Sequence, residues 1–292
     1  MLRKVLCFLA VLVLSEAKQL DGLARSGSRN TYTLYTRENI LQPFPIVTWN
    51  PEELTATPYD ASLPSVFIVH DHEGTGTTTI NPLLKDEILQ FHQANVFIVD
   101  WSFHANSGYN NAVAAVPSIA EFLSAFLEAL EIPLNNTHLI GFGLGAHICG
   151  ITGRDLNGEV ARITGLDPSG RLWGPGTQRL SATDARFVEV IHTDGGGLSN
   201  IGIGTPLGDV DFFINGGSSQ PGCLNNRCCH NRAWEIMAAS MSTFIRGNRC
   251  NNMLQNNLNL CRGVALEVGG INVVKRGSGI YRANTRRSFP FV

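Results

Sequence analysis

The segment from Leu139 to His147 is the part of this sequence that most directly indicates chemistry. It reads Leu-Ile-Gly-Phe-Gly-Leu-Gly-Ala-His, an apolar strand that runs into a glycine-rich turn and then into a helix. A turn of the form G-x-S-x-G in this setting carries a nucleophilic serine, because its strained backbone projects the hydroxyl at the edge of a sheet. The central residue here is Gly143. It has no side chain that could attack a substrate.

Glycine adopts a strained backbone conformation without a steric penalty. We therefore expect Gly143 to relax the turn by ~1 kcal/mol or more relative to serine, so that Gly143→Ser would lower the melting temperature. No serine or cysteine stands elsewhere in the turn. Cys149 lies about two helical turns further on and is expected to point away from the turn.

The elements around this turn alternate between apolar strands and helical patterns. The expected strands are Val66–His70, Asn95–Asp100, Thr137–Gly141, Val160–Leu166, Phe187–His192 and Val210–Ile214, and the expected helices are Ile80–Gln93, Val113–Leu130, Leu144–Gly153 and Asn231–Ile245. This alternation predicts an α/β fold with a doubly wound, mostly parallel sheet. The carboxyl ends of its strands would form one edge, where functional sites form. The last forty residues indicate short strands with glycine turns.

The N-terminus has the pattern of a secretory signal peptide. Arg3 and Lys4 precede an apolar run from Val5 to Leu14, and Ala17 is a suitable cleavage residue. We predict a signal peptide over residues 1–17, with a buried terminal helix or strand as the alternative, and one domain over residues 18–292. No other stretch is long and apolar enough to cross a bilayer.

Composition excludes some classes of protein. Apolar residues make up 43% and charged residues 16%, as expected for a sizeable core, and a net charge of −2 gives no indication of nucleic-acid binding. Five basic residues between Lys275 and Arg287 are compatible with a patch for an anionic surface, but a solvated loop is the simpler interpretation.

Six cysteines follow the predicted cleavage site, and an exported protein normally pairs its cysteines as disulfides. The local pairs are Cys223–Cys228 and Cys250–Cys261, which leaves Cys149 and Cys229 either paired with each other or free. A zinc site built from Cys223, Cys228, Cys229 and His230 is the rival interpretation. Adjacent cysteines suit tetrahedral zinc poorly, so we expect no metal and no cofactor. Asn135 opens a glycosylation sequon in a predicted loop.

Several long motifs in the correct order resemble the pancreatic lipase family. The turn is similar to that family's G-H-S-L-G-A-H signature, with Phe142 in place of histidine and Gly143 in place of serine. The other matching segments are Val99–Ser102, Ile163–Pro168, Phe187–Asp194, Asp209–Cys223 and Cys228–Ala233. The resemblance spans roughly residues 30–290 and implies an α/β-hydrolase fold.

The resemblance assigns roles by position. Asp167 matches the aspartate that orients the catalytic base, and His230 matches the base itself, so the triad is degenerate only at Gly143. The backbone N–H groups of His72 and Leu144 match the donors of the oxyanion hole. Asp71 stands where the family has glycine. It therefore adds a side chain at a position where we expect the backbone to need a positive φ. Its charge would oppose a developing oxyanion.

Two further departures concern the surroundings of the site. Only residues 224–227 separate Cys223 from Cys228, where lipases of this family have a long lid, so the resemblance is to its short-lid phospholipase A1 branch. No C-terminal β-sandwich of the colipase-binding kind is expected.

Three functions follow from this pattern. The first is a secreted, non-catalytic protein that binds or stores a lipid or other apolar ligand; it resembles the insect yolk proteins of this family, which also lack the serine. The second is a weak carboxylic ester, triacylglycerol or phospholipid A1 hydrolase with water activated by His230. The third is an interaction protein that competes with active lipases for a partner or a lipid surface. The sequence names no protein partner.

Overall fold

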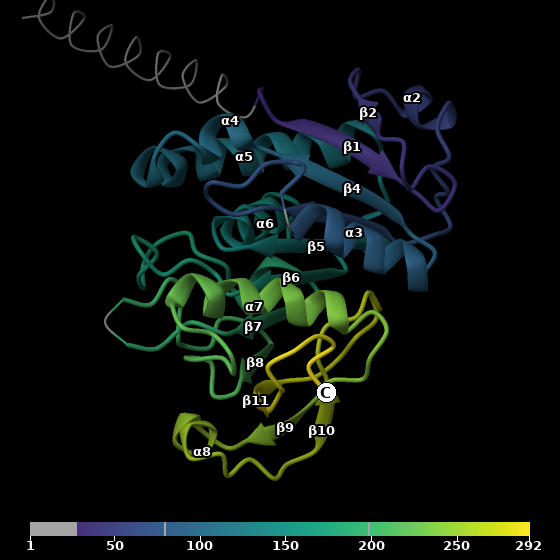
Figure 1. The fold of residues 1–292 in the computed structure, drawn as a ribbon. Helices are drawn as coiled ribbons and strands as arrows, with labels where there is room; N and C mark the ends of the chain where they lie inside the picture. The colour runs from purple at the N-terminus through teal and green to yellow at the C-terminus, as the bar shows by residue number, and fades with distance from the viewer. Residues whose placement is uncertain (1–27, 79, 198) are drawn as a thin grey trace, which may run out of the picture.

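The computed structural model describes residues 28–78, 80–197 and 199–292, so the predicted signal peptide lies outside the described residues. The described chain forms one eleven-stranded sheet with the order β10-β9-β11-β8-β7-β6-β5-β3-β4-β1-β2 (Figure 1). The strands are β1 Thr31–Tyr35, β2 Phe44–Ile46, β3 Ser65–Val69, β4 Asn95–Asp100, β5 Thr137–Phe142, β6 Arg162–Leu166, β7 Val188–His192, β8 Val210–Ile214, β9 Arg246–Cys250, β10 Ala265–Glu267 and β11 Gly279–Ala283.

The centre of the sheet is parallel, and its ends are antiparallel. Strands β4, β3, β5, β6, β7, β8 and β11 pair in parallel. Strands β1 and β2 at one end, and β9 and β10 at the other, pair antiparallel. The predicted doubly wound, mostly parallel sheet is therefore confirmed. The antiparallel pair β1–β2 was not predicted from the sequence.

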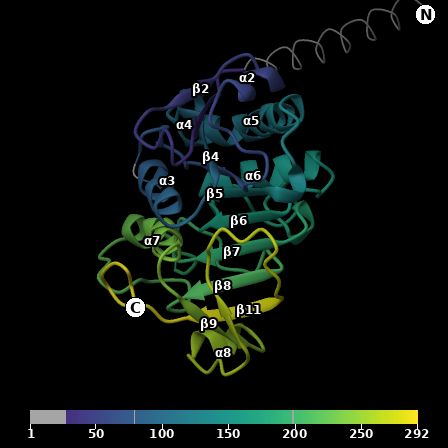
Figure 2. The ribbon, with the colours of Figure 1, turned by 90° about the vertical axis from the view of Figure 1, so that its right-hand side faces the viewer.

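Helices cover both faces of the sheet (Figure 2). They are α2 Pro51–Thr55, α3 Ile80–Phe91, α4 Ser102–Ala105, α5 Tyr109–Ala129, α6 Leu144–Asp155, α7 Asn226–Ala239 and α8 Met253–Asn257, with 3₁₀ turns at Leu134–Asn136 and Ala182–Asp184. α3 and α7 pack on one face, and α5 and α6 pack on the other. Each face therefore has its own apolar core. α5 is long and apolar enough to cross a membrane by length and composition, but here it packs in the core.

One predicted helix needs correction. The helix expected at Asn231–Ile245 is α7, which begins five residues earlier and ends six residues earlier, at Ala239. The side chain of Asn225 accepts a hydrogen bond from the Cys228 N–H (2.8 Å) and caps a start that looked like a loop. Of the two alternatives left open for Cys149 and Cys229, the structure has the free one: they form no disulfide, and both are buried. They lie on α6 and α7, on opposite faces of the sheet. The two local disulfides, Cys223–Cys228 and Cys250–Cys261, are present.

Candidate functional site

The turn between β5 and α6 has the sharp geometry that its glycines predict. Gly143 has φ 57° and ψ −114°, a left-handed conformation that a residue with a Cβ adopts only under strain. A Cβ on Gly145 would lie 2.3 Å from the Val69 carbonyl oxygen, so the helix can approach β3 this closely only without a side chain there. The strained elbow is thus retained although the central residue carries no nucleophile.

Asp167 and His230 meet next to this turn. Asp167 follows β6, and its Oδ2 lies 2.7 Å from Nδ1 of His230, which α7 holds on the other side of the site. The second carboxylate oxygen of Asp167 accepts the backbone N–H groups of Thr193 (2.8 Å) and Asp194 (3.0 Å). Both side chains are buried. Asp167 and His230 are 63 positions apart in the chain, and they form the pair that the family resemblance implies.

The carboxylate of Asp71 occupies the space in front of Gly143. A Cβ placed on Gly143 would lie 2.1 Å from Cγ and from Oδ1 of Asp71, far inside van der Waals contact. The Leu144 N–H donates to Asp71 Oδ1 (2.6 Å), and the nearby backbone N–H of His72 also favours the charged form of this carboxylate. Nε2 of His230 lies 3.1 Å from Asp71 Oδ2. The carboxylate thus fills the place of a side chain at position 143 and accepts the backbone N–H that follows it.

This arrangement corrects one sequence expectation. The turn after β3 was expected to need a positive φ at Asp71, but Asp71 does not have one, and the left-handed residue is Glu73 (φ 59°). Asp71 therefore fits its backbone without strain, and its side chain is free to turn toward Gly143. The absence of a side chain at Gly143 is what gives the carboxylate room. The two departures from the family motif, Asp71 and Gly143, are sterically complementary.

His230 is a cation between two carboxylates. Burial alone would lower its pKa, but the hydrogen bonds and negative charges of Asp167 and Asp71 outweigh burial and raise the pKa of His230 to about 9. Burial opposes ionisation of Asp71, yet the hydrogen bond and charge of His230 lower the pKa of Asp71 below its usual range. At neutral pH both ring nitrogens of His230 carry protons and donate outward. Nε2 then has no lone pair with which to accept a proton.

Neighbouring groups complete the site. Phe142 packs against the His230 ring with centroids 4.3 Å apart and the ring planes tilted by 32°, a contact that the sequence alone could not reveal. Burial, reinforced by the charge of Asp167, raises the pKa of Asp194 to about 6. Within the described part of the chain, no group of three or more histidine, cysteine or acidic side chains could hold a metal ion.

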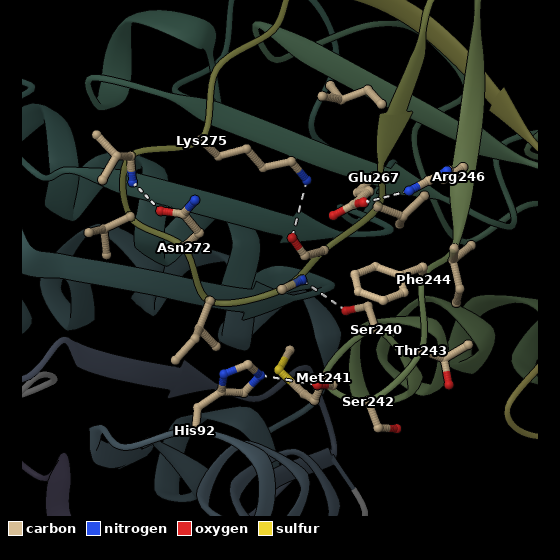
Figure 3. Close-up of a pocket in the computed structure, with 18 of the residues that line it drawn as sticks. His92, Ser240, Met241, Ser242, Thr243, Phe244, Arg246, Glu267, Asn272 and Lys275 are labelled. Carbon is tan, nitrogen blue, oxygen red and sulfur yellow. Dashed lines mark hydrogen bonds and ion pairs between the residues drawn. The ribbon is translucent and has the colours of Figure 1, made fainter.

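Two cavities bear on ligand binding. One of about 240 Å³ adjoins the carboxylate of Asp71 and is lined by His72, Phe142 and Trp234 among others. The other, of about 900 Å³, is lined by loop residues 240–246, by residues 265–276, and by Pro64 and His92 (Figure 3). None of the site residues described above lines the larger cavity. In the short segment between Cys223 and Cys228, Leu224 is exposed and Arg227 lines the small cavity.

The family model described as Lipase matches residues 13–258. The chain belongs to the lipase family. Its relatives include Lipase member H-A of Xenopus laevis, 35% identical over 76% of this chain and 50% of the relative. Phospholipase A1 member A of Rattus norvegicus is 41% identical over 56% of this chain and 37% of the relative. The chain thus spans about half the length, or less, of these relatives.

The lipase family membership and the parallel sheet together identify the fold as that of an α/β-hydrolase. Among solved structures, an α/β-hydrolase enzyme from a Medee basin deep-sea metagenome library matches with a TM-score of 0.32 and 16% identity. That match covers 57% of this chain and 65% of the other. Membership of the lipase family fixes the scaffold, and the chemistry has to be judged from the site.

Proposed function

We propose that this lipase-family chain is a secreted protein that does not hydrolyse esters and that acts by binding a lipid or another apolar ligand. The position of the Asp71 carboxylate carries the first part of this proposal. Ester hydrolysis needs a nucleophile, a base that can accept its proton, and donors that receive the oxyanion. At this site all three requirements fail together.

The nucleophile position is empty of reactive atoms because Gly143 has no side chain. Loss of the serine from a triad costs on the order of 10⁶ in turnover, although oxyanion donors alone can retain ~10³–10⁴ over water. That remainder is not expected here, since the Leu144 N–H, which we assign as an oxyanion donor together with the His72 N–H, already binds the Asp71 carboxylate. A substrate carbonyl would have to displace a charged acceptor.

Weak hydrolysis through water activated by His230 is the rival function. A general base must be unprotonated at the working pH. The pKa of His230 is raised to about 9, so at neutral pH most molecules hold this ring as a cation. The geometry therefore favours the binding protein over the hydrolase.

The larger cavity is the better candidate for the apolar ligand. Ligand sites usually enclose about 300–1,000 Å³, and the cavity beside Asp71 falls below that range while the other lies within it. Met241, Phe244 and Leu266 line the larger cavity, and so do Arg246 and Lys275, which pair with Glu267 and Glu189 (Figure 3). This combination suits an acyl chain with a polar head group.

Secretion and glycosylation belong to the same proposal. The two disulfides are the kind of bond that an oxidising compartment maintains. Asn135 is exposed in the 3₁₀ turn before β5, where an oligosaccharide would not clash with the core. The signal pattern at residues 1–17 supports export.

Ligand binding is tested with the purified secreted protein. Native mass spectrometry and lipid extraction should find a retained apolar molecule, and a fluorescent fatty acid should bind and be displaced by unlabelled fatty acid. Phe244→Glu should weaken this binding, whereas Phe103→Glu, at another exposed phenylalanine outside the cavity, should not. Absence of any ligand and of fatty-acid binding would refute the binding function, whatever the esterase assay gives.

A further inference from the structure

The segment from Cys250 to Cys261, here called the leucine loop, has a composition unlike the rest of the surface. It reads Cys-Asn-Asn-Met-Leu-Gln-Asn-Asn-Leu-Asn-Leu-Cys and contains no charged residue. The disulfide Cys250–Cys261 closes it at its base. The candidate functional site and the proposed ligand cavity make no use of this segment. Its sequence calls for a separate explanation.

The leucine loop turns its apolar side chains outward. Leu254, Leu258 and Leu260 are 66%, 58% and 52% exposed. Leu254 and Leu258 are four residues apart on α8 and its C-cap, so they point to the same side. A soluble protein gains nothing from leaving several leucines in water at one place, and such a cluster usually marks a contact surface.

The leucine loop is held firmly by its polar residues. The buried side chain of Asn256 donates to the Gly216 carbonyl (3.2 Å), and Arg282 donates to the Asn256 carbonyl (2.6 Å). The side chain of Asn252 caps α8 by accepting from the Gln255 N–H (3.0 Å). With the disulfide, these contacts fix the leucines in an outward position on a preformed scaffold.

Two arginines flank the leucine loop, within a stretch of the sequence that is rich in basic residues. Residues 246–292 contain eight basic residues and one acidic residue, Glu267, although the whole chain has a net charge of −2. Arg249 and Arg262 directly flank the loop and are exposed. Val264, close behind, is 80% exposed. Figures 1 and 2 show α8 at the end of the molecule formed by β9 and β10.

We propose that the leucine loop docks this protein on an anionic lipid surface. Exposed apolar side chains enter the boundary between head groups and acyl chains, and nearby arginines bind the acidic head groups. A soluble polyanion would need the arginines but not the leucines, and a neutral apolar partner would need the leucines but not the arginines. The juxtaposition of both favours the lipid surface. This inference does not depend on the proposed ligand cavity or on loss of esterase activity.

Vesicle sedimentation tests the proposal with the full secreted protein. The probes are vesicles of phosphatidylcholine alone and of an about 7:3 mixture of phosphatidylcholine and phosphatidylserine. The protein should bind the mixed vesicles, with affinity falling as salt rises. Leu254→Glu with Leu258→Glu should reduce the affinity at least ~10-fold, because both side chains would have to leave the acyl boundary. The matched control is Leu41→Glu with Leu172→Glu, two exposed leucines elsewhere, which should bind like the unmodified chain.

Substitution of the two flanking arginines tests the electrostatic part of the proposal independently. Arg249→Gln with Arg262→Gln should lower the affinity for mixed vesicles ~5-fold or more per residue, since each basic side chain near an anionic surface contributes about a fivefold factor. Circular dichroism and fatty-acid binding should stay unchanged in all these variants. No vesicle binding would overturn the proposal. Vesicle binding that survives the leucine changes but is competed by dextran sulfate would also overturn it. A dimer in sedimentation velocity that dissociates when the leucines are changed would overturn it as well.

Discussion

The sharpest consequence of the structure concerns the pair of residues 71 and 143. In Gly143→Ser the new Cβ would lie 2.1 Å from Asp71 Cγ, so the carboxylate must leave its position. It would then lose the hydrogen bonds with Leu144 (2.6 Å) and His230 (3.1 Å), and the serine would also sit at a left-handed φ. Hydrogen bonds to charged groups contribute about 1.5–3 kcal/mol each, and such backbone strain costs about 1–3 kcal/mol. We expect the free energy of unfolding to fall by about 4 kcal/mol.

Asp71→Gly should behave differently in the two backgrounds. Alone, it removes the same two hydrogen bonds and should cost about 3 kcal/mol or more. Added to Gly143→Ser, it relieves the clash and should cost little further, so the two changes should deviate from additivity by about 3 kcal/mol. Urea unfolding of the four proteins measures this deviation. Additive costs would show that Asp71 does not occupy the space of the serine.

The double variant should also gain chemistry. The serine hydroxyl, the freed Leu144 and His72 N–H groups and the Asp167–His230 pair would then be present together. With one carboxylate removed, the pKa of His230 should fall toward neutrality. We expect hydrolysis of a short-chain p-nitrophenyl ester to rise at least ~10³-fold in the double variant and to stay near background in Gly143→Ser alone. Equal activity in both variants would refute the blocking role of Asp71.

Three further predictions follow from charge, thiols and burial. The rise in the pKa of His230 from 6.5 to about 9 contributes about 3 kcal/mol of stability below pH 6.5, lost as pH rises to 9, so Asp71→Asn should flatten the pH dependence of unfolding. Thiol titration should find two reactive groups, Cys149 and Cys229, in denatured protein and slow reaction in native protein. Arg162→Met should cost about 3 kcal/mol of unfolding free energy, because it breaks the buried pair with Glu189.

The pH series and the buried arginine each have a matched control variant, and the thiol titration has a result that would contradict it. For the pH series, Asp60→Asn removes an exposed carboxylate far from His230 and should leave the slope between pH 6.5 and 9 unchanged. Finding no reactive thiol after denaturation would mean that the two cysteines are paired after all. For the buried arginine, Arg246→Met at an exposed ion pair should cost less than about 1 kcal/mol. Equal losses of unfolding free energy in Arg162→Met and Arg246→Met would contradict the view that burial makes the Arg162–Glu189 pair more important for stability.

The central strands and the elbow could be predicted because their residues are locally unambiguous. β4 and β8 match the expected ranges, and Gly143 has the positive φ that a glycine at the centre of such a turn implies. Both depend on contiguous apolar runs and on glycine, which report directly on burial and backbone shape. The meeting of Asp167 with His230 followed from motif order rather than from any local pattern.

The position of the Asp71 side chain could not be predicted. The sequence placed a charge near the oxyanion donors, but it could not show that the carboxylate fills the gap left by Gly143 and pairs with His230. Contacts between residues more than seventy positions apart depend on how the whole sheet is assembled. The start of α7 was not predicted for a local reason. Its first turn consists of polar residues that look like a loop, and these residues are helical beside the Asn225 cap and the Cys223–Cys228 disulfide.

The central claim is that the unmodified chain does not hydrolyse esters, and turnover of the purified secreted protein tests this most directly. With short- and long-chain esters at neutral pH, we expect no release of product above a heat-killed control. Measurable hydrolysis that disappears in His230→Ala would contradict the account, because it would mean that His230 still serves as a base beside a carboxylate that was thought to block the site.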